Sequence, residues 1–466
     1  MSEQEHPLDS HTAKVLPWII AVAFFMQMLD GTALNTALPS MAVDMETTPV
    51  HMQSVVISYA LTLAFMIPAS GWIAEHFGAK RVFMGAMLLF TLSSLACGVS
   101  QSLPMIVLFR IVQGIGGALM VPVGRLIALK AYPRDQFVDI LSFITMPSLV
   151  GPLIGPTLGG LMVEYLSWHW IFFINLPVGI IGLIATARYM PSLDKSDDQA
   201  PFDLSGFLLF GSFMLSITIG LEGIGEFHFP VSITAALLIA GVASILIYFL
   251  HARRKAAPIF SISLFQVRNF RIGILGNICA RLGNGAMPFL TPLLLQMGLG
   301  YSPMQAGMMM IPMTVGAIAA KWVVTRLVHR FGFKPVLVIN TMMLGVMIAV
   351  YSLITPEMDY WVMLGIFTVF GLVNSTQFTA MNTVTLVDLS QQQASSGNSM
   401  FAAVQQLSMG MGVAVAASIL DWFMKPSSQQ AGAVILDALS STYICLGTIA
   451  FISTILFVQL GKSSVK

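Results

Sequence analysis

One acidic residue, Asp30, interrupts the apolar stretch FMQMLDGTALNTALP at residues 25–39. A charge at the centre of a membrane helix costs about 2.5–3.5 kcal/mol on insertion scales, so such a residue usually has a function. At a helical rise of about 1.5 Å per residue, Asp30 and Arg110 fall at similar depths in two different helices. Burial favours a protonated carboxylate, whereas a nearby arginine favours the ionised form. We therefore predict that Asp30 is a proton-coupling group and Arg110 its modulator; a static ion pair that serves folding is the alternative.

The composition indicates that these residues lie on membrane helices. The chain has 466 residues, of which 56% are hydrophobic and only 9% charged, and its mean hydropathy is +0.83. Soluble domains carry about 25% charged residues. The net charge of +1 gives no basic surface for nucleic acid. The sequence has no HExxH or GxSxG motif and no Cys/His cluster, so we expect no metal, no cofactor and no enzyme activity; a polytopic membrane enzyme is a remote alternative.

Hydropathy predicts fourteen spans, because a membrane helix needs about 20 mostly apolar residues. They lie near residues 17–38, 52–72, 82–100, 103–124, 139–162, 170–190, 204–222, 231–250, 272–296, 305–325, 335–354, 360–383, 398–420 and 438–460. With a cytoplasmic N-terminus, eighteen basic residues, Arg125 among them, fall on the inner side and only Lys425 on the outer side. This bias fits the positive-inside rule and places both termini in the cytoplasm.

The two halves of the chain share a repeated sequence. GWIAEHFGAK at residues 71–80 and TRLVHRFGFK at 325–334 share a Phe-Gly-x-Lys sequence, each after the second helix of its half. The repeat predicts two parallel six-helix bundles around an inserted pair. The predicted organisation is a tail at 1–16, an N-terminal bundle at 17–190, an inserted two-helix pair at 204–250, a C-terminal bundle at 270–460 and a tail at 461–466.

Five motifs point to one family. They are LDGTALNTALP, GWIAEHFGAKR, LFRIVQGIGGALMVPVGR, GPLIGPTLGG and WHWIFFINLPVG. Together they resemble the fourteen-helix drug:proton antiporters of the major facilitator superfamily. The resemblance implies an all-α major facilitator fold with a 6+2+6 arrangement, and proton-coupled efflux of small molecules by alternating access. It also implies a monomer in the bacterial inner membrane, whose partners are a small-molecule substrate, protons and the lipid bilayer.

Further residues receive roles from spacing and from this resemblance. The glycines of the fifth span recur every four residues beside two prolines, which suits either a moving seam or a plain close-packed helix pair. The predicted conformational motif is Gly151, Pro152, Gly155, Pro156 and Gly159. The predicted cytoplasmic latch is Gly71, Glu75, Gly78, Lys80 and Arg81, with positive-inside anchoring as the alternative for its two basic residues. The predicted substrate cavity is Phe24, Gln27, Met28, Asn35, Gln113, Arg281 and Asn284.

The charge balance leaves the substrate class open. The ionisable residues predicted within the membrane, Asp30, Arg110, Arg281 and Lys321, sum to +2. An unpaired Arg281 near the midplane would bind a carboxylate in bidentate fashion. Efflux of an anionic metabolite, or of a metal–organic acid complex such as iron-citrate, is therefore the alternative to multidrug efflux. Arg281 could instead bond helix carbonyls, or pair with Asp30 across the cavity.

Overall fold

The computed structural model describes residues 10–34, 37–47, 49–133, 136–191, 201–225, 229–301, 303–424 and 431–461, and every regular element in them is a helix. The N-terminal half comprises α1 (Ser10–Ala33), α2 (Leu38–Asp44), α3 (Pro49–Met66), η2 (Ile67–Ala69), α4 (Ser70–Phe77), α5 (Ala79–Gly98), α6 (Leu103–Ala131), α7 (Phe137–Tyr165), α8 (Trp170–Phe173) and α9 (Asn175–Tyr189). The inserted pair is α10 (Leu204–Gly225) and α11 (Val231–Arg254), followed by η4 (Ile262–Gln266). The C-terminal half comprises α12 (Arg268–Asn284), α13 (Met287–Leu293), η5 (Leu294–Gly298), α14 (Pro303–Met309), α15 (Ile311–Phe331), α16 (Phe333–Val350), η6 (Tyr351–Leu353), α17 (Tyr360–Leu386), α18 (Gln391–Phe423), α19 (Ala431–Ile452) and α20 (Thr454–Val458).

The predicted all-α polytopic architecture is confirmed. Thirteen segments of the described residues are long and apolar enough to span a membrane. They coincide with thirteen of the predicted spans, and α7, a helix of 29 residues, occupies the place of the fifth. The two repeated sequence segments end in the same way, because Gly78 has a φ of 88° and Gly332 a φ of 79°. A left-handed backbone conformation favours glycine, so it explains why both copies keep this residue.

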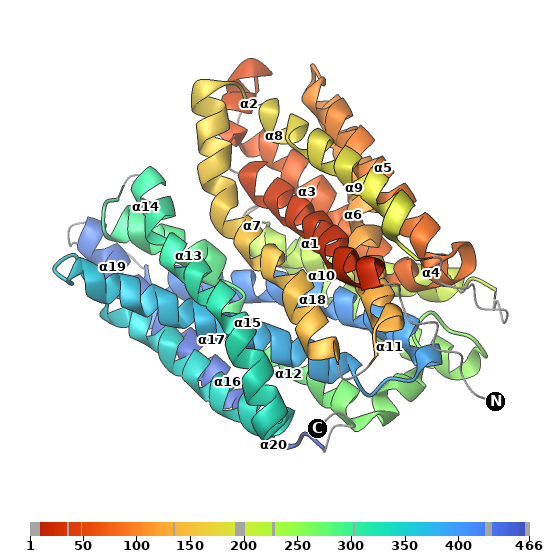
Figure 1. The fold of residues 1–466 in the computed structure, drawn as a ribbon. Coiled ribbons are helices and arrows are strands. Elements are labelled where there is room, and N and C mark those ends of the chain that lie inside the picture. Colours follow the sequence, from red (N-terminus) through yellow and green to blue (C-terminus); the bar gives the residue numbers. More distant parts are fainter. Residues whose placement is uncertain are drawn as a thin grey trace.

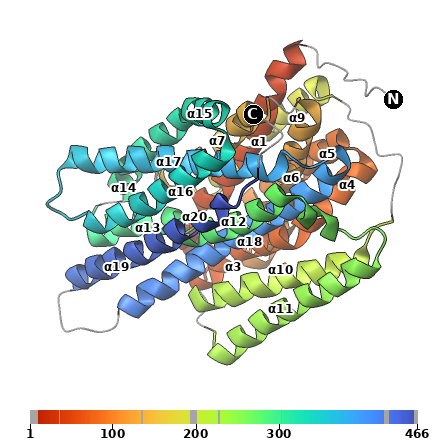
Figure 2. The same cartoon turned by 90° about the horizontal axis from the view of Figure 1, so that it is seen from below.

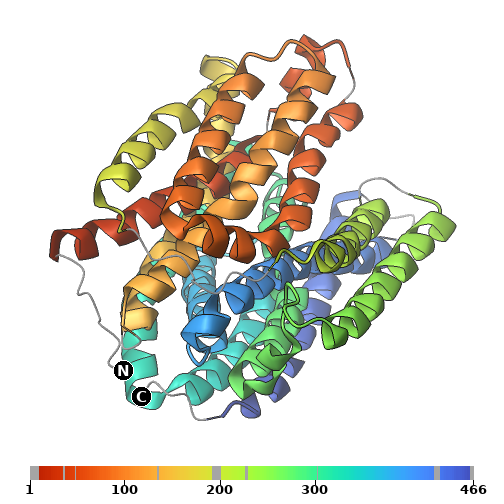
Figure 3. The same cartoon turned by 90° about the vertical axis from the view of Figure 1, so that its right-hand side faces the viewer.

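The helices form two groups, shown from the side in Figure 1 and turned in Figure 3, where the N-terminal half lies above the C-terminal half. The start of α1, the end of α6, the start of α12 and the end of α20 lie at one end of the bundle, which we call the terminus side. One hydrogen bond joins these ends within each half: the Tyr132 hydroxyl donates to the Ala13 carbonyl (2.7 Å), and Arg268 Nε donates to the Gln459 carbonyl (3.0 Å).

The two halves meet at a seam on the terminus side. There η2, α4 and α6 pack against α18, and α7 packs against α15. Hydrogen bonds to α18 cross this seam: the Ser70 and Ser399 hydroxyls lie 3.0 Å apart, Asn398 Nδ2 donates to the Pro122 carbonyl (2.7 Å), and Arg125 Nη2 donates to Gln405 Oε1 (3.2 Å). The largest buried apolar cluster includes residues of both halves. At the opposite end each half has its own apolar cluster, so in this conformation the halves are joined on the terminus side.

The inserted pair lies beside both halves, as the view from below shows (Figure 2). Helix α10 packs against α3 of the N-terminal half and α18 of the C-terminal half. The Asp203 carboxylate lies 2.9 Å from His251 Nε2 and accepts a bond from the Gly206 amide (3.1 Å), which ties the start of α10 to the end of α11. Burial acts to raise the pKa of Asp203, but the His251 and backbone bonds outweigh it and hold that pKa below its ordinary value.

Candidate functional site

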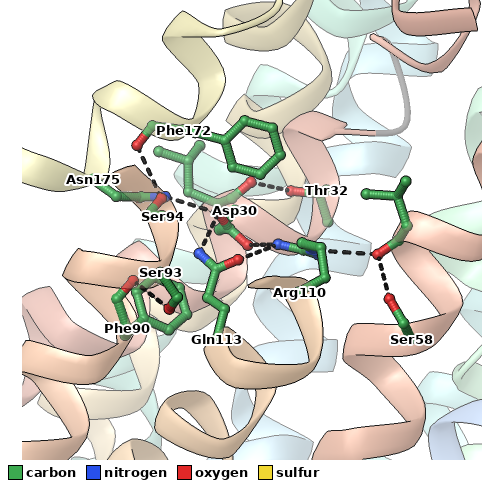
Figure 4. A network of polar contacts seen from close by, with 12 residues as sticks. Asp30, Thr32, Ser58, Phe90, Ser93, Ser94, Arg110, Gln113, Phe172 and Asn175 are labelled. Atoms are coloured by element: carbon green, nitrogen blue, oxygen red, sulfur yellow. Dashed lines mark hydrogen bonds and ion pairs between the residues drawn. The ribbon is translucent and has the colours of Figure 1, made fainter. Parts of the chain in front are cut away.

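The residues around Asp30 come from four helices of the N-terminal half (Figure 4). Asp30 lies three residues before the end of α1, and Arg110 and Gln113 lie one turn apart on α6. Asn175 begins α9, and Ser94 lies on α5. Four helices therefore surround one carboxylate that is 2% exposed.

Asp30 and Arg110 form a direct ion pair. Arg110 Nη1 lies 2.5 Å from Asp30 Oδ2, and neither side chain is exposed. The same Nη1 also donates to Gln113 Oε1 (2.7 Å), while Gln113 Nε2 donates to Asp30 Oδ1 (3.1 Å). The two charges, predicted to lie at a common depth, are thus in contact. Gln113 forms a hydrogen bond with each of them.

Asn175 and Ser94 complete the site, and the sequence analysis assigned neither a role. Asn175 Nδ2 donates to Asp30 Oδ1 (2.7 Å) and to Ser94 Oγ (3.0 Å). Ser94 Oγ in turn donates to the Phe172 carbonyl (3.0 Å). Asn175 falls within the motif WHWIFFINLPVG, so the motif could have identified it as a candidate site residue. Ser94 lies in an apolar span without a motif, and nothing in the sequence distinguishes it.

The surroundings of Arg110 hold its guanidinium in place without a second acid. Its Nε donates to the Val55 carbonyl (3.1 Å), and its guanidinium carbon lies 4.2 Å from the centre of the Tyr59 ring. Nη2 is buried and has no partner among the described residues. Arg110, Gln113 and Asn175 all donate to Asp30. A proton on Asp30 Oδ2 would compete with the bond from Arg110, whereas Oδ1 could still accept from Gln113 and Asn175.

The other predicted cavity residues of the first helix lie on different surfaces. Phe24 is buried and faces Gly124 of α6, and Gln27 is buried with an Oε1 that has no partner in the described part of the chain. Met28 is half-buried and packs on Gly151 of α7. Asn35 lies outside the described residues. Phe24 and Met28 therefore contact neighbouring helices of the N-terminal half.

Arg281 and Asn284 lie on α12 in the other half. Arg281 Nε donates to Asn277 Oδ1 (2.6 Å), and its guanidinium carbon lies 4.6 Å from the centre of the Phe378 ring. Asn284 Nδ2 donates to Asn374 Oδ1 (2.5 Å). Because Asp30 is bound to Arg110, Gln113 and Asn175, Arg281 is not its partner in this conformation.

Gly151 and Gly155 of α7 face α1 of the same half. A Cβ at Gly151 would lie 2.8 Å from Met28 Cβ, and one at Gly155 would overlap Oγ1 of Thr32. Gly159 is buried, and the side chains of Pro152 and Pro156 lie outside what the structure describes. This contact favours the close-packed helix pair over a glycine seam between the halves, although α7 also packs on α15 and α17 of the C-terminal half.

The predicted latch residues all belong to the N-terminal half, and they contact different halves of the molecule. An added Cβ at Gly71 would lie 2.6 Å from Ser399 Oγ on α18, so this glycine allows α4 to approach the C-terminal half closely. Glu75 is adjacent to Ser395 on the same helix and lines a cavity of about 170 Å³ with it. Lys80 instead donates to the Met190 carbonyl (2.6 Å), just past the end of α9. Gly78 forms the turn, and Arg81 borders a groove within the N-terminal half.

The sequence placed one residue wrongly. The positive-inside pattern places Arg125 in an inner loop, but α6 continues to Ala131 and buries Arg125 at 2% exposure. It lies at the seam, where its Nη2 donates to Gln405 Oε1 of α18 (3.2 Å). A count of loop charges cannot separate a helix-end arginine that reaches water from one that faces a second bundle.

Two joined bundles of membrane-length helices, the first with a buried ion pair, place the chain among polytopic membrane proteins. The sequence profile of the Major Facilitator Superfamily matches residues 20–413. The chain therefore belongs to this superfamily, and the predicted family is confirmed.

Curated relatives extend the match to nearly the full chain. The chain is 43% identical over 449 residues to the "Putative multidrug resistance protein MdtD" of Pectobacterium atrosepticum, covering 96% of each. It is 48% identical over 408 residues to the protein of the same name from Escherichia coli O1:K1 / APEC, covering 87% of this chain and 86% of the other. The human organic anion transporter MFSD10 (TETRAN) has a similar fold, with a TM-score of 0.69, 13% identity, and 96% and 100% of the two chains covered.

Proposed function

We propose that this protein exports small molecules across the bacterial inner membrane in exchange for protons, with its terminus side in the cytoplasm. The observation that carries the proposal is the Asp30 site, where one buried carboxylate is the acceptor of three side-chain donors. A buried ion pair contributes little net stability, so stability alone is a weak reason to keep one. A carboxylate that exchanges a proton as its partners change is a stronger reason.

The proposed cycle moves the two halves about the seam. When the terminus side is closed, as here, Asp30 is bound to Arg110. Protonation of Asp30 from the opposite side would release Arg110 and favour the conformation that opens the terminus side, where substrate binding would expel the proton. Helix α1 connects the site to the seam, because Met28 packs on α7 and α7 packs on α15. A ligand shifts such an equilibrium only through its different affinity for the two conformations.

Proton release on substrate binding tests this function. Purified protein in weak buffer with a pH-sensitive dye is titrated with lipophilic cations and with organic acids. We expect at least one compound to release protons from the wild type and none from Asp30→Asn under the same conditions. Binding without proton release across the pH range in which the protein is folded would contradict proton coupling.

An anionic substrate is the second candidate, and Arg281 is the observation in its favour. Arg281 is 6% exposed and forms none of the ion pairs within the described residues, and its Nη2 has no partner there. A lipophilic cation would find no complementary charge beside it.

A further inference from the structure

A groove on the surface of the N-terminal half lies between α5 and its neighbours α4 and α6. Its volume is about 360 Å³, within the range of about 300–1,000 Å³ that is typical of ligand-binding clefts. Arg81 lies at one end, and the rest of the lining is apolar. The apolar residues include Ile73 and Phe77 of α4, Val82, Gly85 and Leu89 of α5, and Leu119 of α6.

The open side of the groove faces the lipid. Phe77, Arg81 and Gly85 on its border are exposed, as are Leu88 and Leu92 further along α5. Helix α5 is one of the membrane-length segments, and it packs against α4, α6, α8 and α9 of its own half. Exposed leucines on such a helix contact acyl chains, so the groove opens into the hydrocarbon of the membrane.

Gly85 keeps the groove open. Glycine is unfavourable in a helix interior, so it usually marks a close contact with another helix. Gly116 of α6 is such a case, because an added Cβ there would lie 2.8 Å from the Ala86 carbonyl of α5. An added Cβ at Gly85 meets nothing within 4 Å. Helix packing therefore does not require this glycine, and a larger side chain would occupy the groove instead.

Arg81 supplies a positive charge at the terminus-side end of the groove. It lies in the first turn of α5 and takes part in none of the ion pairs within the described residues. The neighbouring Lys80 points elsewhere, since it donates to the Ala187 and Met190 carbonyls. At about 1.5 Å of rise per residue, Leu89 lies roughly 12 Å deeper in the membrane than Arg81. A charged entrance above an apolar channel matches the shape of a phospholipid.

We propose that this groove binds an anionic phospholipid, with its phosphate at Arg81 and one acyl chain along Val82, Gly85 and Leu89. A guanidinium binds phosphate oxygens through charge-assisted hydrogen bonds, and basic pockets between membrane helices bind anionic headgroups. None of the eight residues that the structure describes along the groove is acidic. The cationic part of a zwitterionic headgroup would therefore find no counter-charge there. This inference does not depend on proton coupling.

Helix α4 lies between the groove and the seam. Ile73 and Phe77 line the groove, whereas Gly71 and Glu75, about half a turn away, line the cavity that Ser395 of α18 borders. A lipid in the groove thus packs against the back of a helix that contacts the other half. We expect bound lipid to stabilise this helix in the conformation described here.

Native mass spectrometry of the delipidated full-length protein in detergent tests the headgroup preference. The probes are phosphatidylglycerol and phosphatidylcholine with the same acyl chains. We expect the first phosphatidylglycerol to bind at least tenfold more tightly than the first phosphatidylcholine. Arg81→Gln should weaken phosphatidylglycerol binding and remove this preference. Arg254→Gln, at an exposed arginine that ends α11, should keep it.

Gly85→Leu tests the groove itself. Leucine fills the channel from a position where an added Cβ meets no other atom within 4 Å, so the variant should fold and lose at least tenfold in affinity for phosphatidylglycerol. Gly365→Leu is the matched control, because Gly365 is an exposed glycine of α17 with equally open surroundings. Phosphatidylglycerol should raise the unfolding temperature of the wild type and of this control more than that of Gly85→Leu.

The proposal is overturned if the wild type binds the two lipids equally, or if either Arg81→Gln or Gly85→Leu binds phosphatidylglycerol at wild-type affinity. A change in oligomeric state in Gly85→Leu without a change in lipid binding would show that a second copy of the chain occupies the groove. If the leucine variant does not fold, Gly85→Val takes its place under the same criteria.

Discussion

Asp30→Asn is expected to lose proton-driven efflux down to the level of empty vesicles while still inserting into the membrane. Asparagine keeps the shape of the side chain, but its one oxygen replaces only one of the two that accept from Arg110 and Asn175, and it cannot exchange a proton. Proteoliposomes with an imposed pH gradient measure uphill transport, and fluorescence-detected size exclusion measures the amount of folded protein. Efflux from the asparagine variant at the wild-type rate would remove Asp30 from the coupling mechanism.

Two further variants distinguish a loss of transport from a loss of folding. Breaking a buried pair by removing one partner costs about 3–5 kcal/mol, because the remaining charge is uncompensated. Asp30→Asn combined with Arg110→Gln removes both charges and should regain stability without regaining uphill transport. Asp30→Glu keeps the titratable group and should retain part of the transport. Recovery of uphill transport in the double variant would show that the pair serves folding alone.

Gly155→Leu is expected to abolish the folded protein, whereas Gly160→Leu on the same helix should be tolerated. An added Cβ at Gly155 would overlap Thr32 of α1, and the nearest backbone atom, the Ala33 nitrogen, would lie at 3.1 Å. An added Cβ at Gly160 meets nothing within 4 Å. Overpacking of a tight contact typically costs about 1–3 kcal/mol, and more where backbone must move.

The yield of monodisperse protein and its unfolding temperature measure this difference. A Gly155→Leu protein that folds with wild-type stability but does not transport would support the other interpretation of this glycine face, a surface that slides during the cycle. Equal loss of folding in both variants would show that leucine is not tolerated at either position of α7. The overlap with Thr32 would then not be the cause.

The helical plan and the central charge pair could be predicted from the sequence for simple physical reasons. Membrane helices are recognised by their length and hydropathy, and a fixed rise per residue converts sequence position into depth. Asp30 and Arg110 could therefore be placed at one level from their positions in the chain alone. Their contact required in addition that α1 and α6 be neighbours, which the family resemblance implied.

The rest of the site depends on how helices turn toward one another. Asn175 contacts Asp30 only because α9 begins beside the end of α1, and depth alone does not show this. Arg125 looked like an anchor in an inner loop, since the charges of helix ends and of loops look alike in a sequence. The glycines of α7 looked suited to a seam between the halves, yet Gly151 and Gly155 face α1, because a four-residue repeat identifies a close contact and not the partner.

Infrared difference spectroscopy of the Asp30 carboxyl group tests the central claim most directly. Spectra of the wild type and of Asp30→Asn are recorded with and without a transported substrate at a pH where substrate binding releases protons. The account predicts that substrate converts a protonated carboxyl band into a carboxylate band in the wild type, and that this change is missing from Asp30→Asn. Identical difference spectra for the two proteins would mean that Asp30 keeps one protonation state throughout, and would contradict its role as the coupling group.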